Sequence, residues 1–269
     1  MSPFTCDLVI SYYKEKLDWL KQFESFPFRH IYLYTKGKEP EVPIQKDKVK
    51  VVKLENIGRC DHTYIYHMAH NYADLATVTI FTTGSAHLPH KNGNMRFIVP
   101  KVFETHNSVF RVMDEPDYRE KFKEFKMNSW RATNTNNQNS NSSKNILSPA
   151  IIRPFGKWYE SLFQGIEVKQ VAYGGVFAVS RAHIHHRPVD FYKKLLDQFP
   201  NHSNPEIGHY FERVWLAIFH PVPSECVFVE GANPPPENPV YKVGGSRRRR
   251  SGRSSRKNTL RRRRNSSRI

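Results

Sequence analysis

The chain has 269 residues, of which 38% are hydrophobic, so it can bury one substantial core with room for a small subdomain. No window approaches the ~18 consecutive apolar residues of a membrane-spanning helix, and the N-terminal residues lack the basic segment and apolar run of a signal peptide. The odd count of three cysteines (Cys6, Cys60 and Cys226) is typical of free thiols in a reducing compartment. These features predict a cytoplasmic protein without a transmembrane segment.

The formal net charge of +17 is concentrated at the C-terminus. Residues 246–269 contain eleven Arg, one Lys and no acidic residue, so residues 1–245 carry only +5 of that total. Runs of like charge such as Arg247–Arg250 and Arg261–Arg264 are typically disordered and bind polyanions. We therefore expect a disordered Arg-rich tail over 244–269. Its expected partners are nucleic acid or an acidic membrane surface, and nuclear targeting is a further role for such a run.

Buried strands and amphipathic helices alternate along the first 85 residues. Such alternation is typical of an α/β fold whose central sheet is mostly parallel and flanked by helices. Short apolar runs predict the strands, and apolar residues at helical spacing predict the helices. The expected strands are Asp7–Ser11, His30–Tyr34, Lys48–Leu54 and Thr77–Phe81, and the expected helices are Lys14–Phe26 and a segment that ends near Tyr72.

The ends of these strands are where a binding site is expected. In parallel sheets, ligands bind at the carboxyl ends of the strands, where the chain turns into helices. Four short segments follow predicted strands in this way: Ser11–Lys14, Gly58–His62, Gly84–His87 and Ser180–Arg181. Within the second of them, Asp61 is predicted to be the N-cap of the following helix rather than a nucleotide ligand.

A later segment has the composition of a central strand. Val176–Val179 is continuously apolar, which predicts a strand buried on both faces. Gly174 and Gly175 precede it and mark a place where a ligand or another backbone comes close. An acidic helix is predicted over 204–215. A purely structural alternative is that the glycines let a helix pack closely while Glu212 pairs with an arginine.

The remaining segments are less regular. Residues 133–145 are mostly Asn, Ser and Thr, which predicts a disordered insert within one domain because the strand pattern resumes after it. Helices are expected around Tyr118–Phe125 and Pro188–Phe199. We therefore expect a single domain over 1–243, followed by the tail.

Several motifs resemble a known family. They are Asn56-Ile57-Gly58-Arg59 with His62-Thr63-Tyr64, the strands Val78–Gly84 and Val176–Arg181, and Phe211-Glu212-Arg213-x-Trp215. Over about residues 6–220 they resemble a poorly characterised family from fungi, algae and large algal viruses, itself similar to glycosyltransferases of the GT-A fold. The resemblance implies a GT-A-like, Rossmann-type sheet. It also implies transfer of a hexose or pentose from a nucleotide-sugar, expected to be UDP-linked, to a hydroxyl of a glycan or glycoprotein acceptor.

The resemblance implies roles for three sets of residues. A catalytic carboxylate on the acidic helix, Glu212 in preference to Glu206, would accept the proton of the acceptor hydroxyl in an inverting transfer. The donor would be bound by Ser11, Tyr12, Gly58, Arg59, His62, Gly84 and Ser85. The acceptor or the sugar would be faced by Tyr173, Gly174, Gly175 and Arg181.

Metal binding is left open by the sequence. GT-A enzymes that depend on a divalent metal usually carry an Asp-x-Asp motif where this chain has Thr82-Thr83-Gly84-Ser85. Either Mg²⁺ or Mn²⁺ is held by other residues, or Arg59 and lysines neutralise the leaving diphosphate. His87 and His90 are better placed as alternative metal ligands than the histidines at 183–186.

Two functions without catalysis are the alternatives. One is a polyanion- or nucleic-acid-binding protein that acts through its Arg-rich tail. The other is a degenerate transferase fold kept only for binding, which the missing Asp-x-Asp motif permits.

Overall fold

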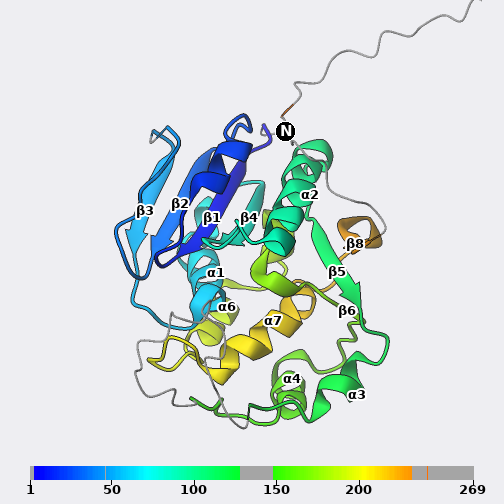
Figure 1. Cartoon of the computed structure of the whole chain (residues 1–269). Helices are drawn as coiled ribbons and strands as arrows, with labels where there is room; N and C mark the ends of the chain where they lie inside the picture. Colours follow the sequence, from blue (N-terminus) through cyan, green and yellow to red (C-terminus); the bar gives the residue numbers. More distant parts are fainter. Residues whose placement is uncertain (1–2, 46, 128–147, 232–240, 242–269) are drawn as a thin grey trace, which may run out of the picture.

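The computed structural model describes residues 3–45, 47–127, 148–231 and 241 (Figure 1). The predicted insert at 133–145 and the predicted tail at 244–269 lie outside the described residues. None of the helices that the structure describes combines the length and the apolar character needed to cross a membrane.

The central sheet consists of Cys6–Tyr12 (β1), His30–Thr35 (β2), Val49–Lys53 (β3), Val78–Thr83 (β4) and Phe177–Ser180 (β7). The strand order is β3-β2-β1-β4-β7. Figure 1 labels the first four of these strands in this order. The first four strands run parallel, and β7 pairs with β4 in the antiparallel direction. The prediction of an α/β fold with a mostly parallel central sheet is confirmed.

Helical segments cover both faces of this sheet, which is why every residue of β1 and β4 is buried. Side chains alternate along β1: Val9 belongs to one apolar core, and Leu8 and Ile10 belong to the other. The first core includes residues of α1 (Arg59–His70), α6 (Val189–Leu196) and α7 (Glu206–Ile218). The second includes residues of the 3-10 segment Asp18–Phe23 and of α2 (Pro89–Thr105).

A smaller sheet extends the same domain. It consists of Phe110–Asp114 (β5), Gln170–Val171 (β6) and Val227–Val229 (β8), in the order β6-β5-β8. An isolated bridge between Val109 and Ala178 joins it to β7. The remaining elements are α3 (Tyr118–Lys123), α4 (Phe155–Phe163), α5 (Arg181–Ile184) and 3-10 turns at Tyr72–Asp74, Tyr173–Gly175 and Ser224–Cys226.

The first predicted helix is replaced by a shorter segment. Instead of a helix over Lys14–Phe26, only Asp18–Phe23 is helical, and it is a 3-10 segment. The carboxylate of Glu15 accepts two backbone N–H bonds, which fixes a tight turn directly after β1. Trp19 Nε1 then donates to Gly84 O at 2.9 Å and holds the segment against the end of β4.

The long helix α2 was not predicted. It contains Pro100, whose ring removes one backbone hydrogen bond from the helix interior. Its sequence also mixes polar and apolar residues without a clear helical stripe. The omission matters because the first turn of α2 carries Lys91 to the end of β4.

Candidate functional site

The carboxyl ends of β1 and β4 form the centre of the candidate site. The strand order reverses between these two strands, because β2 and β3 lie on the other side of β1. Such a switch point leaves a crevice where ligands of α/β sheets bind. Gly84 N–H donates to Ser11 O at 2.7 Å, and Ser11 Oγ lies 3.0 Å from Thr63 Oγ1 of α1. Two predicted donor-binding residues, Ser11 and Gly84, are therefore neighbours, and the ring of Tyr12 lies against Gly84.

Arg59 begins α1 in an unusual backbone conformation. Gly58 and Arg59 have φ angles of 60° and 52°, a left-handed conformation that costs a non-glycine residue about 1–2 kcal/mol. The N–H groups of both residues donate to carbonyls of residues 202–203, at 2.9 and 3.2 Å. Lys36 is buried at the end of β2 and donates from Nζ to the carbonyls of Ile57 and Arg59. Strain that is held in place by so many contacts is typical of functional sites.

Two buried ionisable groups lie next to this turn. Desolvation lowers the pKa of Lys36 to about 7. Desolvation, together with the charge of Glu212, raises the pKa of the Asp61 carboxyl to about 8. Asp61 Oδ1 has no hydrogen-bond partner among the described residues. Asp61 is therefore not the predicted N-cap of α1, because Gly58 occupies that position and Asp61 is the third helical residue.

Arg59 and Glu212 form a charged pair that joins α1 to α7. Arg59 Nη1 lies 3.7 Å from Glu212 Oε1, and the two side chains are 29% and 23% exposed, so both are accessible to a ligand. His209 Nδ1 also lies 3.7 Å from Glu212 Oε2. Burial lowers the pKa of His209 to about 4, so its imidazole is neutral at pH 7 and Arg59 supplies the positive charge next to Glu212.

Gly174 and Gly175 bring the loop before β7 to the same edge of the sheet. Both have φ angles in the left-handed region, 84° and 67°. A Cβ on Gly175 would lie 3.2 Å from Cys60 Sγ and 3.5 Å from Thr83 Cγ2, so this backbone fits closely between the start of α1 and the end of β4. Tyr64 OH donates to Gly175 O at 2.7 Å and fixes the loop there.

Lys91 is in the first turn of α2, and its ammonium group lies next to the end of β4. It was not predicted as a site residue from the sequence. Its Nζ donates to Thr83 Oγ1 at 3.1 Å and to Ser85 Oγ at 3.0 Å. Desolvation lowers its pKa, and the charges of Arg59 and Glu212 also act on it. The sequence contained a signal for a helix at this position. Two hydroxyl residues follow a predicted strand, and after them comes Pro89, a residue type that can start a helix.

A protein-family model described as "Protein of unknown function (DUF3431)" matches residues 8–232. The chain belongs to the DUF3431 family. The matched region extends from β1 through β8 and contains Arg59, Lys91 and Glu212. It ends before the Arg-rich segment. No curated protein matches the chain.

In this DUF3431 protein, the second predicted catalytic carboxylate lies in a different environment. Glu206 is fully buried, and its Oε1 accepts from Met127 N at 2.6 Å. Its Oε2 accepts from Ala150 N at 2.8 Å and lies 2.8 Å from Arg153 Nε. Because both oxygens are engaged and excluded from solvent, the structure gives Glu206 a structural role in place of the predicted catalytic one.

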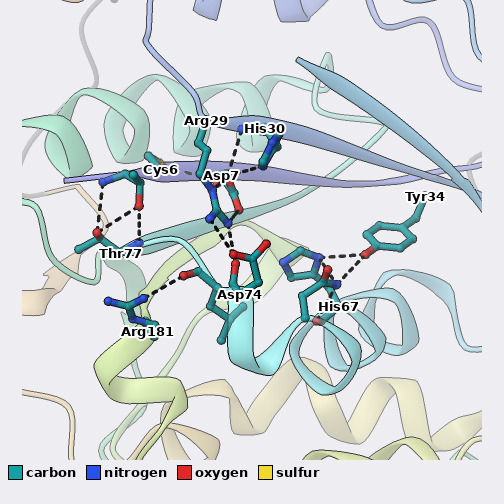
Figure 2. Close-up of polar contacts among 12 residues, drawn as sticks. Cys6, Asp7, Arg29, His30, Tyr34, His67, Asp74, Thr77 and Arg181 are labelled. Carbon is teal, nitrogen blue, oxygen red and sulfur yellow. Dashed lines mark hydrogen bonds and ion pairs between the residues drawn. The ribbon is translucent and has the colours of Figure 1, made fainter. Parts of the chain in front are cut away.

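Arg181 lies at the opposite edge of the sheet from the candidate site. Because β7 is antiparallel to β4, Ser180 pairs with Val78 at the amino end of β4. Arg181 Nη1 donates to Leu75 O at 3.4 Å, and Figure 2 shows it among the residues of this amino edge. Arg181 was predicted to face the sugar on the assumption that β7 ends at the same edge as the parallel strands, and the structure places it away from the candidate site.

His62 and Tyr173 are two further residues of the predicted site. The ring of His62 packs against Phe199, with centroids 5.4 Å apart. Burial lowers the pKa of His62 to about 3, so it offers no positive charge to a phosphate. The ring of Tyr173 lies 5.9 Å from the guanidinium of Arg213, the residue after Glu212. Both side chains are half-buried, and the predicted contact of Tyr173 with the acceptor or the sugar stays a prediction.

No three His, Cys, Asp or Glu side chains of the described residues are arranged to hold a metal ion. His183 Nδ1 lies 2.6 Å from Ser108 Oγ and 2.9 Å from Ser180 Oγ, at the amino edge. His90 is exposed, and its Cδ2 lies 3.9 Å from the position of a Cβ on Gly174. Among the described residues, Lys91 and the hydroxyls of Thr83 and Ser85 lie at the end of β4, where metal-dependent GT-A enzymes usually carry the Asp-x-Asp motif.

Proposed function

We propose that this DUF3431 protein is a glycosyltransferase of the GT-A type. It would transfer a hexose or pentose from a nucleotide-sugar, with UDP as the expected carrier, to a hydroxyl of a glycan or glycoprotein acceptor. The observation that carries the proposal is the Arg59–Glu212 pair at the switch point of a mostly parallel sheet. The motifs that resemble a family similar to GT-A glycosyltransferases support the same function.

Arg59 binds the diphosphate of the donor. It begins the twelve-residue helix α1, whose dipole attracts an anion. Its guanidinium matches two phosphate oxygens at once. The many contacts that hold the Gly58–Arg59 turn fix this group before the donor arrives, so little conformational entropy is lost on binding.

Glu212 acts as the general base. It accepts the proton of the acceptor hydroxyl while the hydroxyl oxygen forms a bond to the anomeric carbon. The bond between that carbon and the phosphate oxygen breaks, and its electron pair leaves with the nucleoside diphosphate. Glu212 suits this role because its side chain is partly exposed, whereas Glu206 is not. Among the described residues, a Cβ on Gly174 would have only His90 Cδ2 within 4 Å, so Gly174 leaves space next to the reacting sugar.

A binding screen tests the proposal. The purified full-length chain is titrated calorimetrically with UDP-, GDP- and CDP-sugars, each with and without Mn²⁺. We expect binding of at least one class, with UDP-sugars preferred, and weaker binding by Arg59→Ala. If the folded chain binds none of these donors under either condition, the proposal fails and the degenerate-fold alternative gains support.

A second candidate function is binding of a polyanion through the Arg-rich tail. The family match ends at residue 232, so the tail is separate from the region that defines the family. A basic tail can localise an enzyme on an acidic membrane surface or direct it to the nucleus, and the cytoplasm is otherwise the expected location. Retention on heparin, compared between the full chain and one truncated at residue 245, tests this function.

A further inference from the structure

Lys91 is a partly buried cation whose only hydrogen-bond acceptors among the described residues are neutral. The hydroxyls of Thr83 and Ser85 accept from its Nζ, and no carboxylate of the described residues lies within 4 Å of it. An ammonium group has three donors, so two hydroxyls leave one for a ligand. A cation in this environment is stabilised when an anion binds.

The position of Lys91 is fixed from both sides. Thr83 is the last residue of β4, and Lys91 is in the first turn of α2. Between them, a Cβ on Gly84 would lie 2.7 Å from Glu15 Oε2, so this turn is closely packed against the segment after β1. The ammonium group is therefore held at the end of β4, next to the switch point between β1 and β4.

Charged groups of both signs act on Lys91, and Arg59 is the other cation among them. Arg59, Glu212, Glu15 and the Cys60 thiol are the titratable groups that act on it electrostatically. Arg59 lowers the pKa of Lys91, because two positive charges in one low-dielectric region repel each other. A diphosphate bound between the two cations would remove this repulsion.

We propose that Lys91 and Arg59 together bind the diphosphate of the donor, and that Lys91 takes the role of the divalent cation in stabilising the leaving group. This inference rests on the proposed function for the identity of the donor. As the bond to the anomeric carbon breaks, negative charge develops on the departing phosphate oxygen. The ammonium of Lys91 and the guanidinium of Arg59 donate hydrogen bonds to the diphosphate, so donor binding needs no metal.

The test uses the full-length chain and two probes, inorganic pyrophosphate and UDP-sugar, each titrated with EDTA and with Mn²⁺. We expect the wild type to bind pyrophosphate equally well in EDTA and in Mn²⁺. Lys91→Met should weaken this binding at least tenfold, and Lys91→Arg should restore most of it. Lys101→Met is the matched control, because Lys101 lies on the same helix and pairs with Glu104, and it should bind like the wild type.

Two results would overturn the inference: pyrophosphate binding that requires Mn²⁺, or binding in EDTA that Lys91→Met leaves unchanged. If Lys91→Met does not fold, Ser85→Ala serves instead, because it removes one of the two hydroxyls that hold the ammonium and should weaken binding two- to fivefold. Pyrophosphate binding that depends on Lys91, with no UDP-sugar binding, would support the anion site and contradict the proposed transferase. If neither pyrophosphate nor UDP-sugar binds, the result contradicts both the anion site and the proposed transferase.

Discussion

Arg59 Nη1 lies 3.7 Å from Glu212 Oε1, so a charged pair joins the first residue of α1 to the second turn of α7. Both helices lie on the same face of the sheet, and both contribute to the same apolar core. The pair therefore places the proposed phosphate-binding cation and the proposed proton acceptor at one end of that core. The proposed chemistry requires that Arg59 can contact the donor and Glu212 the acceptor. The partial exposure of both side chains permits this.

Glu212→Gln should retain donor binding and lose about 10²-fold or more in kcat, because a general base is removed while the shape of the side chain is kept. The measurement is steady-state transfer to an acceptor, with the melting temperature as control. The melting temperature should change little, because a partly exposed ion pair contributes about 0–1 kcal/mol. Near-normal turnover by a folded Glu212→Gln variant would leave the pair with a structural role only.

Glu206→Gln should lower the free energy of unfolding by about 3 kcal/mol, because it removes the charge that pairs with Arg153 and places an amide group against a backbone donor. Urea denaturation measures the change. Glu160→Gln is the control: Glu160 pairs with Arg119 on the surface, where loss of the pair should cost less than about 1 kcal/mol. Equal effects of the two substitutions would contradict the anchoring role of Glu206.

Arg59→Gly should be about 1 kcal/mol more stable than Arg59→Ala, because glycine adopts a φ of 52° without strain. Both variants should bind the nucleotide-sugar at least tenfold more weakly, a loss of about 1.4 kcal/mol. Thermal denaturation and calorimetric titration measure the two effects separately. Normal binding by Arg59→Gly would place the diphosphate elsewhere.

Lys36 should make stability depend on pH. Its pKa is about 7 in the folded protein and 10.5 as the unperturbed value. Because the folded-state pKa is the lower one, the unfolded chain binds one more proton than the folded protein between these two values. The free energy of unfolding therefore falls as the pH falls, and the full loss is reached below about pH 7. As pH rises from 7.5 to 9.5, the wild type should gain about 1.4 kcal/mol per pH unit relative to Lys36→Met. Urea titrations across this range measure the difference, and a constant difference would show that Lys36 stays charged.

Removal of residues 246–269 should leave the melting temperature and donor binding unchanged, because the family match and the described elements end before them. The truncated chain should elute from heparin at lower salt, since its formal charge falls from +17 to +5. Loss of donor binding in a folded truncated chain would assign the tail a direct role in the site.

The sequence by itself determined the fold class and the strands of the central sheet, and the smaller sheet, α2 and α4 were not predicted. Local apolar runs predicted all five strands of the central sheet, and glycines at strand ends predicted where the backbone would turn. These features could be read because they depend on neighbouring residues in the chain. The positions of Ser11, Arg59 and Gly84 near one another followed from the rule that parallel strands end at the same edge.

The tertiary structure alone decided which of the candidate residues meet. The direction of β7 depends on its pairing with β4, and this pairing brought Gly175 to the site and took Arg181 to the opposite edge. Glu206 and Glu212 belong to one helix, and only the packing around α7 buried the first and left the second accessible. Lys91 lies at the site because it is in the first turn of α2, a helix that was not predicted from the sequence. Burial and pairing between distant segments are properties of the whole chain, so no local pattern encodes them.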